Sequence, residues 1–235
     1  MSLPLIVLRP EPGCTATVTA ARAQGLDARG FPLHAIRATP WTPVAREAFD
    51  ALLIGSANAL RHAGPALAGW RGAPAYVVGE ATAAAARDAG LEVVGIGGNG
   101  LQSTLGLLDP RHRRLLRLAG RERILLAPPD GVTVIDREVY ASEPVAMPRG
   151  LIDLLRDAAV PGVVVALHAG AAARHFAGEC ARLGIDRGRI TLVAIGPRVA
   201  ALAGAGWAAS PVAARADDAA LLALAGQLCQ KRAEG

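Results

Sequence analysis

The chain has 235 residues, of which 52% are apolar and 19% are charged, and its formal net charge is +5. This composition excludes a disordered chain, which would combine low apolar content with high net charge, and it suffices for one large domain or two small ones. The longest runs without a charged residue have about 16 residues and contain Gly or Pro, whereas a membrane-spanning helix needs about 20. We therefore expect no membrane span.

The first residues, MSLPLIVLR, hold no basic segment and only a short apolar stretch, so we expect no signal peptide and a cytoplasmic location. The three cysteines, Cys14, Cys180 and Cys229, are scattered, and the five histidines show no spacing typical of metal ligands. We expect reduced thiols and no bound metal.

Apolar segments of strand length alternate with helical segments along the chain. We expect strands at residues 3–8, 28–36, 51–55, 75–78, 92–96, 115–118, 162–167 and 191–195. We expect helices at residues 15–24, 57–68, 81–89, 101–108, 151–158, 171–183, 197–203 and 218–231. Continuous apolar strands between helices are typical of parallel sheets covered on both faces. The sequence therefore predicts an α/β fold with doubly wound parallel sheets.

An internal repeat divides the chain into two similar α/β domains. Residues 50–56 (DALLIGS) match residues 162–168 (GVVVALH), and each segment leads into an Ala-rich helix. Residues 77–84 match residues 194–201 one strand–helix unit later.

Two segments, residues 31–38 and 137–145, alternate polar and apolar side chains and flank the first copy of the repeat. If both cross between the domains, they form a two-stranded linker, and one domain is inserted in the other. We expect a discontinuous domain of residues 1–34 and 146–235, an inserted domain of residues 39–136, and linker strands at 35–38 and 137–145.

The basic residues are concentrated in one segment. Residues 111–123 hold six Arg and one Glu, which accounts for the whole net charge. A single basic focus attracts anions, but only 3% of the residues are aromatic, so a stacking platform for single-stranded nucleic acid is not expected. A small polycarboxylate or phosphorylated ligand fits better.

Turns after the predicted strands are the candidate binding sites. In parallel α/β sheets the ligand lies at the carboxyl ends of the strands, where helix N-termini offer free N–H groups to anions. Each turn also fits an ordinary cap or tight turn, but together they would present anion-binding backbone to one ligand. The candidate residues are Arg9, Ser56, Asn58, Gly79, Thr82, His168, Gly170, Gly196 and Arg198.

An alternative site is the loop at residues 95–100 (GIGGNG), which matches the dinucleotide fingerprint G-x-G-x-x-G. The next strand should end in an acidic residue that binds the ribose, but residues 118–121 are LAGR. The fingerprint is therefore incomplete, and a nicotinamide titration would test it.

Short motifs spread over nearly the whole chain resemble the uroporphyrinogen-III synthase family. They are LRP at residues 8–10, SANA at 56–59, VGEATA at 78–83, LAGR at 118–121, VY at 139–140 and AIGP at 194–197, in the order found in that family. The chain length and the inserted-domain arrangement also fit.

The resemblance implies a lyase of tetrapyrrole and heme biosynthesis. Such an enzyme converts linear hydroxymethylbilane to uroporphyrinogen III with loss of water and inversion of ring D, through a spiro intermediate and without a cofactor. The substrate carries eight carboxylates and cyclises spontaneously without inversion, so the enzyme's task is largely to hold it in one conformation.

The resemblance also implies site residues. The family's tyrosine of the inter-domain strand corresponds to Tyr140, which we expect to assist the departing hydroxyl as a hydrogen-bond donor. Gly120 and Arg121 of the LAGR motif become binding candidates. The chain departs from the family at His168 and Arg198, where hydroxyl side chains are frequent.

We thus expect a monomeric uroporphyrinogen-III synthase that acts on a small molecule and has no nucleic-acid or membrane partner. A two-lobed receptor that closes on a small anion without catalysis is the alternative, and it would lack activity on hydroxymethylbilane.

Overall fold

The computed structural model describes residues 2–98, 100–157 and 159–231. The chain divides into two compact units: unit 1 comprises residues 1–35 and 143–235, and unit 2 comprises residues 36–142. The chain passes between them twice, within strands β3 (His34–Ala38) and β8 (Thr133–Pro144).

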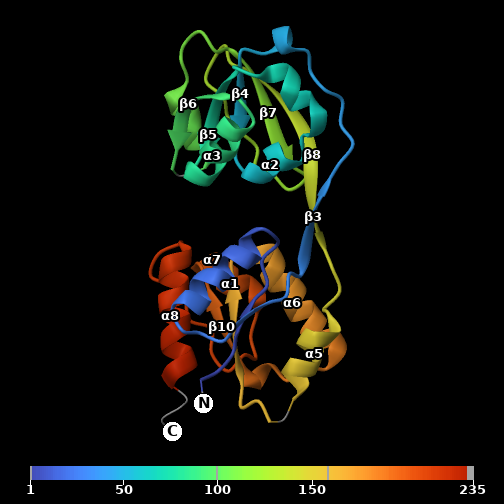
Figure 1. The fold of residues 1–235 in the computed structure, drawn as a ribbon, viewed down its shortest axis with the longest axis vertical. Helices are drawn as coiled ribbons and strands as arrows, with labels where there is room; N and C mark the ends of the chain where they lie inside the picture. Colours follow the sequence, from blue (N-terminus) through green and yellow to red (C-terminus); the bar gives the residue numbers. More distant parts are fainter. Residues whose placement is uncertain (1, 99, 158, 232–235) are drawn as a thin grey trace. The chain divides into compact units, whose positions relative to one another are not determined.

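Unit 1 contains a parallel four-stranded sheet in the order β10–β9–β1–β2. Figure 1 labels its edge strand β10. The strands are β1 (Leu5–Val7), β2 (Ala28–Gly30), β9 (Val163–Leu167) and β10 (Ile190–Ala194). Every residue of β1, β9 and β10 is buried. Burial on both faces explains why these strands are apolar almost throughout instead of alternating.

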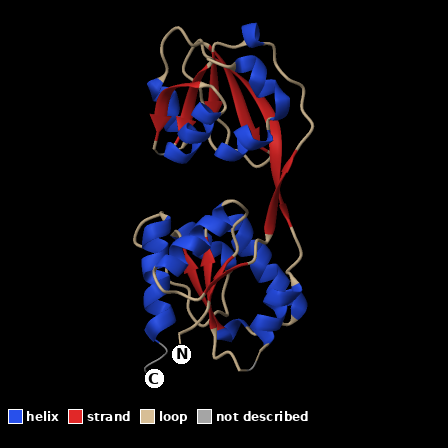
Figure 2. Ribbon diagram, viewed as in Figure 1, coloured by secondary structure: helices blue, strands red, loops and turns tan. Residues whose placement is uncertain are grey.

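Helices cover both faces of the unit 1 sheet. One core cluster joins the sheet to α1 (Gly13–Ala23) and α8 (Asp218–Lys231). The other joins it to α5 (Arg149–Arg156), α6 (Gly170–Leu183) and α7 (Pro197–Ala203). Figure 2 shows the strands enclosed by these helices.

Unit 2 contains a six-stranded sheet in the order β3–β8–β7–β4–β5–β6, parallel from β8 to β6. Its remaining strands are β4 (Ala51–Ile54), β5 (Pro74–Val78), β6 (Glu92–Gly97) and β7 (Arg114–Gly120). Helices α2 (Ala57–His62) and α3 (Glu80–Asp88) pack on one face, and α4 (Leu101–Thr104) packs on the other. The predicted α/β fold with parallel sheets is confirmed.

The strand predicted at residues 28–36 is wrong, because the chain forms two strands there. Pro32 cannot donate to a strand ladder, and the segment between β2 and β3 instead bonds to the end of β1 through Phe31 N to Val7 O (2.9 Å) and Leu33 N to Leu8 O (3.1 Å). β2 and β3 belong to different sheets.

Two predicted helices are shorter than expected. The helix predicted at 57–68 ends at His62, since Gly64 has φ +73° and Pro65 follows, and a 3-10 helix (Gly64–Trp70) continues the chain. The helix predicted at 101–108 is one α turn followed by a 3-10 turn (Leu105–Leu107). The last residue of the helix predicted at 151–158 lies outside the described residues.

Within residues 2–98, 100–157 and 159–231, no helix is both long enough and apolar enough to span a membrane.

A buried carboxylate fixes the connection between β8 and α5. Glu179 on α6 has a side chain only 9% exposed, and its Oε2 accepts a hydrogen bond from Met147 N at 2.8 Å. Arg182 donates to both carboxylate oxygens at 2.7 and 2.9 Å. These hydrogen bonds, above all those from Arg182, lower the pKa of Glu179 from 4.5 to about 2.

We predict that Glu179→Gln lowers the free energy of unfolding at pH 7 by about 2 kcal/mol, because hydrogen bonds to a charged group are lost. The depressed pKa stabilises the folded protein above pH 4.5, and this share is lost as pH falls from 4.5 towards 2. The difference in the free energy of unfolding between wild type and variant, measured with urea, should therefore shrink as the pH falls from 4.5 towards 2. Glu80→Gln, at an exposed position, is the control, and an equal loss there would refute the prediction.

Candidate active site

Unit 2 carries a pocket where β4 and β7 end, beside β8. The carboxyl ends of parallel strands are the usual ligand site of this fold class. The cavity has a volume of about 150 Å³. Its lining residues are Gly55, Ser56, Leu101, Arg117, Leu118, Ala119, Gly120, Glu122, Arg123 and Tyr140. The pocket thus brings together three of the predicted site residues, Ser56, Gly120 and Tyr140.

A bulge in the pairing of β7 and β8 places Tyr140 over Gly120. Ala119 pairs with Glu138, but Gly120 pairs with Tyr140, so Val139 is the extra residue of the bulge. A Cβ atom on Gly120 would lie 2.8 Å from the Cε2 and Cζ atoms of the tyrosine ring, a distance that real Cβ atoms do not show. The ring can therefore occupy this place only because residue 120 is glycine.

The Tyr140 hydroxyl is available to a ligand. The side chain is half-buried, and the His62 ring lies 6.3 Å from its ring, centroid to centroid. In the described part of the chain, no hydrogen bond engages this hydroxyl, and the residue lines the pocket. A phenol in this position can donate a hydrogen bond to a bound molecule.

Ser56 and Asn58 serve the N-terminus of α2. The Ser56 hydroxyl accepts a hydrogen bond from Asn58 N at 3.2 Å, as an N-cap does, and Asn58 Oδ1 accepts from Arg61 Nη1 at 2.9 Å. Gly79 precedes α3 with φ +74°, and Thr82 in its first turn is buried. Asn58, Gly79 and Thr82 do not line the pocket.

Arg117 is a buried cation in the middle of β7. Its side chain is 4% exposed, and Nη1 donates to the carbonyl oxygen of Ile124 at 2.9 Å and lies 3.5 Å from Asp136 Oδ1. Burial lowers the pKa of Arg117 from its usual value, and the neighbouring Arg123 adds to this effect. Nε has no hydrogen-bond partner among the described residues.

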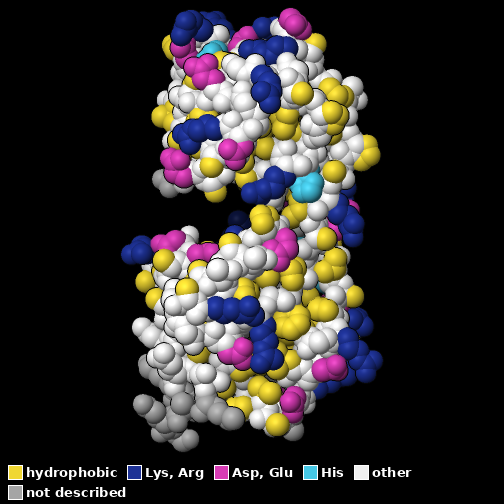
Figure 3. Space-filling model, viewed as in Figure 1, with side chains coloured by type: hydrophobic (Ala, Val, Ile, Leu, Met, Phe, Trp, Pro, Cys, Tyr) yellow, Lys and Arg dark blue, Asp and Glu magenta, His cyan; other side chains and the backbone are white. Residues whose placement is uncertain are grey.

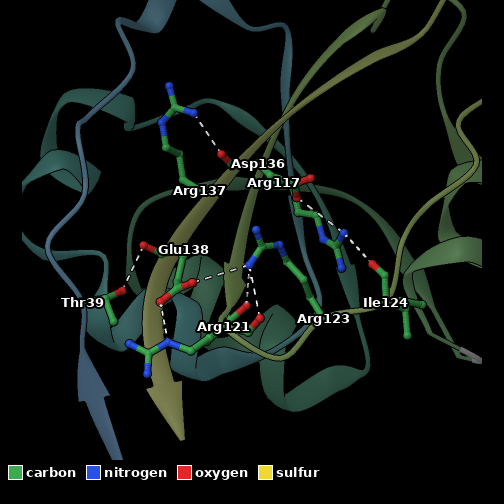
Figure 4. A network of polar contacts seen from close by, with 9 residues as sticks. Thr39, Arg117, Arg121, Arg123, Ile124, Asp136, Arg137 and Glu138 are labelled. Atoms are coloured by element: carbon green, nitrogen blue, oxygen red, sulfur yellow. Dashed lines mark hydrogen bonds and ion pairs between the residues drawn. The ribbon is translucent and has the colours of Figure 1, made fainter.

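Two further arginines share one carboxylate at the end of β7 (Figure 4). Arg121 Nε donates to Glu138 Oε1 at 3.0 Å, and Arg123 Nη1 lies 3.7 Å from Glu138 Oε2. Arg123 lines the pocket, whereas Arg121 does not.

The basic segment does not form a single focus, so that expectation is wrong. Arg111 pairs with Asp109, and Arg114 pairs with Asp50, both at the start of β7. The seven residues of β7, at about 3.3 Å each, separate these groups by roughly 20 Å from those at the strand's other end. Figure 3 shows basic and acidic side chains interspersed on the visible face of unit 2.

In unit 1, Arg9 and His168 meet at Asp218, the first residue of α8. Arg9 Nη1 lies 2.8 Å from Asp218 Oδ2, and the Thr17 hydroxyl donates to the same oxygen at 2.8 Å. His168 Nε2 is 3.2 Å from Asp218 Oδ1. His168, Thr17 and Arg9 lower the pKa of Asp218 to about 2, with His168 the largest cause.

The other unit 1 candidates do not join this cluster. Gly170 begins α6, and a Cβ there would lie 2.4 Å from Leu202 Cδ1, so packing of α7 on α6 requires the glycine. Gly196 precedes α7 with open space around it, and Arg198 is exposed.

The loop at residues 95–100 was the candidate dinucleotide site, and packing accounts for Gly95 and Gly97. Residue 99 lies outside the described residues. A Cβ at Gly95 would lie 2.7 Å from Tyr76 Cδ1, and one at Gly97 would lie 2.1 Å from Thr104 Oγ1. Gly100 has φ +91°.

The described residues contain no group of three or more His, Cys, Asp or Glu side chains that could hold a metal ion.

Sequence reasoning missed Arg117, Arg123, Thr17 and Asp218 as members of these clusters. Arg117 carried a signal, because a charged residue interrupts an otherwise apolar strand. Two partners of Asp218, Thr17 and Arg9, are 201 and 209 residues away in sequence, so only the fold brings them together.

A family model matches most of the chain, and solved structures share its fold. A family model described as "Uroporphyrinogen-III synthase HemD" matches residues 15–223. The solved uroporphyrinogen-III synthetase of Helicobacter pylori is 17% identical, with a TM-score of 0.65 over 96% of this chain and 99% of that one. A mutant uroporphyrinogen III synthase of Thermus thermophilus is 18% identical, with a TM-score of 0.52 over 97% and 99%. At such identities these structures show a shared fold. No curated protein matches in sequence.

We predict that Arg9 and Asp218 are coupled by about 0.5–1 kcal/mol, since the pair is partly exposed but closely spaced. The measurement is a double-mutant cycle of Arg9→Ala and Asp218→Ala in urea unfolding. The control cycle uses Arg149 and Asp153, whose exposed side chains lie 3.8 Å apart and should show no coupling. Equal coupling in both cycles would show that the Arg9–Asp218 pair contributes no more than an ordinary surface pair, and would contradict the prediction.

Proposed function

The chain belongs to the uroporphyrinogen-III synthase family, and we propose that the unit 2 pocket is where its residues carry out the reaction. The enzyme is a lyase that cyclises hydroxymethylbilane to uroporphyrinogen III. One observation carries the proposal: a tyrosine hydroxyl without a hydrogen-bond partner among the described residues shares a pocket with two arginines.

Tyr140 acts where the hydroxyl leaves. In the reaction the C–O bond of the terminal hydroxymethyl group breaks, and the oxygen takes up a proton and leaves as water. The carbon left electron-poor bonds to the substituted α-carbon of ring D and gives the spiro intermediate. The bond from that α-carbon to its original methylene bridge then breaks, and this methylene bonds to the other α-carbon of ring D, which loses its proton, so that the ring is inverted in the closed macrocycle. A hydrogen bond from the Tyr140 hydroxyl to the departing oxygen stabilises the charge that develops on it. A phenol is a weak acid, so this contribution assists a reaction that the substrate can undergo alone.

The substrate's carboxylates bind to turns and basic groups at the carboxyl ends of the strands. In unit 2 these are Ser56, Asn58, Gly79, Thr82, Gly120 and Arg121. In unit 1 they are Arg9, His168, Gly170, Gly196 and Arg198. Support comes from the N-termini of α3 and α6, whose backbone N–H groups suit anions. Arg9, already paired with Asp218, contributes less than a free cation would.

We further propose that residues 1–34 with 146–235 and residues 39–136 are two similar doubly wound domains, joined by linker strands at 35–38 and 137–145. Support comes from the two chain crossings within β3 and β8 and from the repeat, whose copies form the parallel pairs β4–β5 and β9–β10.

The enzyme works as a cytoplasmic monomer on a small molecule, with no nucleic-acid or membrane partner. Support for a reducing compartment comes from the three cysteines, which are free and buried. Burial raises the pKa of each thiol, to about 11 for Cys14 and Cys229 and about 12 for Cys180, so these groups do not act as nucleophiles.

We predict that Tyr140→Phe lowers kcat about 10- to 100-fold and leaves the affinity for product nearly unchanged, because only the donor oxygen is removed. The measurement supplies hydroxymethylbilane, oxidises the products and separates uroporphyrins I and III. Wild type should form isomer III faster than isomer I arises in buffer.

Two outcomes would contradict the proposal. Wild-type protein that yields only isomer I, at the rate of buffer alone, would refute the activity. Full kcat in Tyr140→Phe would leave the tyrosine a packing residue. Tyr76→Phe is the matched control, since its buried hydroxyl already bonds to His112 and Asp109 away from the pocket.

A further inference from the structure

Arg117 is held in a way that stability alone does not explain. A guanidinium removed from water costs several kcal/mol unless its donors and charge are fully matched. In Arg117 the Nε donor is unmatched among the described residues, and the nearest carboxylate oxygen, on Asp136, is 3.5 Å away.

Both residues that Arg117 contacts are exposed to solvent. The Asp136 side chain is 41% exposed, and Ile124 is 60% exposed, on a loop that Figure 4 shows beside the guanidinium. Removal of Arg117 would therefore leave an exposed carboxylate and an exposed residue of the loop. The Arg117 side chain is buried, whereas the two residues that it contacts are exposed to solvent.

The surroundings of Arg117 suit a short anionic group. Arg117 and Arg123 both line the pocket, while Glu122 is the one acidic lining residue, so the lining has an excess of one positive charge. A cavity of about 150 Å³ is smaller than the 300–1,000 Å³ typical of whole small-molecule ligands. A single side arm fits this space better than a ring.

We propose that Arg117 is a specificity-determining residue that binds one carboxylate arm of the linear tetrapyrrole, with Arg123 as the second cation. The inference rests on the proposed function and names the part of the substrate that enters the pocket. Nε and a terminal nitrogen of Arg117 form the planar fork that binds a carboxylate through two hydrogen bonds. An arm fixed here adds to the binding of the substrate in the ground state and in the transition state alike.

The test replaces Arg117 with methionine, which keeps most of the length of the side chain and removes its charge. Because a buried cation is exchanged for an apolar group of similar shape, the melting temperature should stay equal or rise. The KM for hydroxymethylbilane should rise at least about tenfold, with kcat changed less than about threefold, since the arm binds equally in ground and transition states.

Three variants are compared. Arg111→Met removes an exposed, Asp109-paired arginine from the same segment and should leave KM unchanged. Arg117→Lys keeps the charge but loses the fork, and its KM should lie between wild type and Arg117→Met. If Arg117→Met fails to fold, the lysine variant decides, because an unchanged KM there would overturn the proposal.

A second readout separates this inference from the proposed function. Binding of uroporphyrin I, a stable octacarboxylate, is followed by quenching of tryptophan fluorescence. Weaker binding to Arg117→Met than to Arg111→Met supports the carboxylate site even if wild type fails to turn over hydroxymethylbilane. A lower melting temperature with unchanged KM and unchanged uroporphyrin affinity would show that Arg117 is structural and would overturn the inference.

Discussion

The contact of the Tyr140 ring with Gly120 is the constraint on which the unit 2 site depends. Parallel pairing of β7 and β8 would normally set one residue opposite one, and the bulge at Val139 shifts the tyrosine so that it faces the glycine. Only a residue without a Cβ leaves room for the ring. Strand β7 carries both Gly120, against which the Tyr140 ring packs, and Arg117. It therefore positions the tyrosine hydroxyl and the buried cation at one pocket.

In both units, charged side chains near the carboxyl ends of the strands are paired with side chains of opposite charge. Asp218 gathers Arg9, Thr17 and His168 in unit 1, and Glu138 gathers Arg121 and Arg123 in unit 2. Partnered charges keep their positions before a ligand arrives, so less side-chain entropy is lost on binding. Arg117 differs because its burial is poorly compensated, and groups that lower stability in this way are often kept for function.

The strands were predictable from sequence because burial on both faces makes segments such as Val163–Leu167 continuously apolar, and α8 was predicted to begin at Asp218, as it does. The break at Pro32 was missed because apolar residues continue across it, and only the tertiary structure assigns β2 and β3 to different sheets. Ser56, Gly120 and Tyr140 were named from sequence, through motifs and a family resemblance. Asp218 could not be found that way, since its partners come from distant segments. The prediction of a single basic focus was wrong, because acidic partners of these arginines, such as Asp50 and Asp136, lie outside the basic segment in sequence.

The most direct test of this account is the rate of uroporphyrinogen III formation by Gly120→Ala, compared with Gly69→Ala, where an added Cβ meets no atom within 4 Å. We expect the new methyl group to displace the Tyr140 ring, so that isomer III forms at about a tenth of the wild-type rate or less while spontaneous isomer I increases. The melting temperature of both variants is measured alongside. Wild-type formation of isomer III by folded Gly120→Ala would contradict the claim that this contact builds the active site.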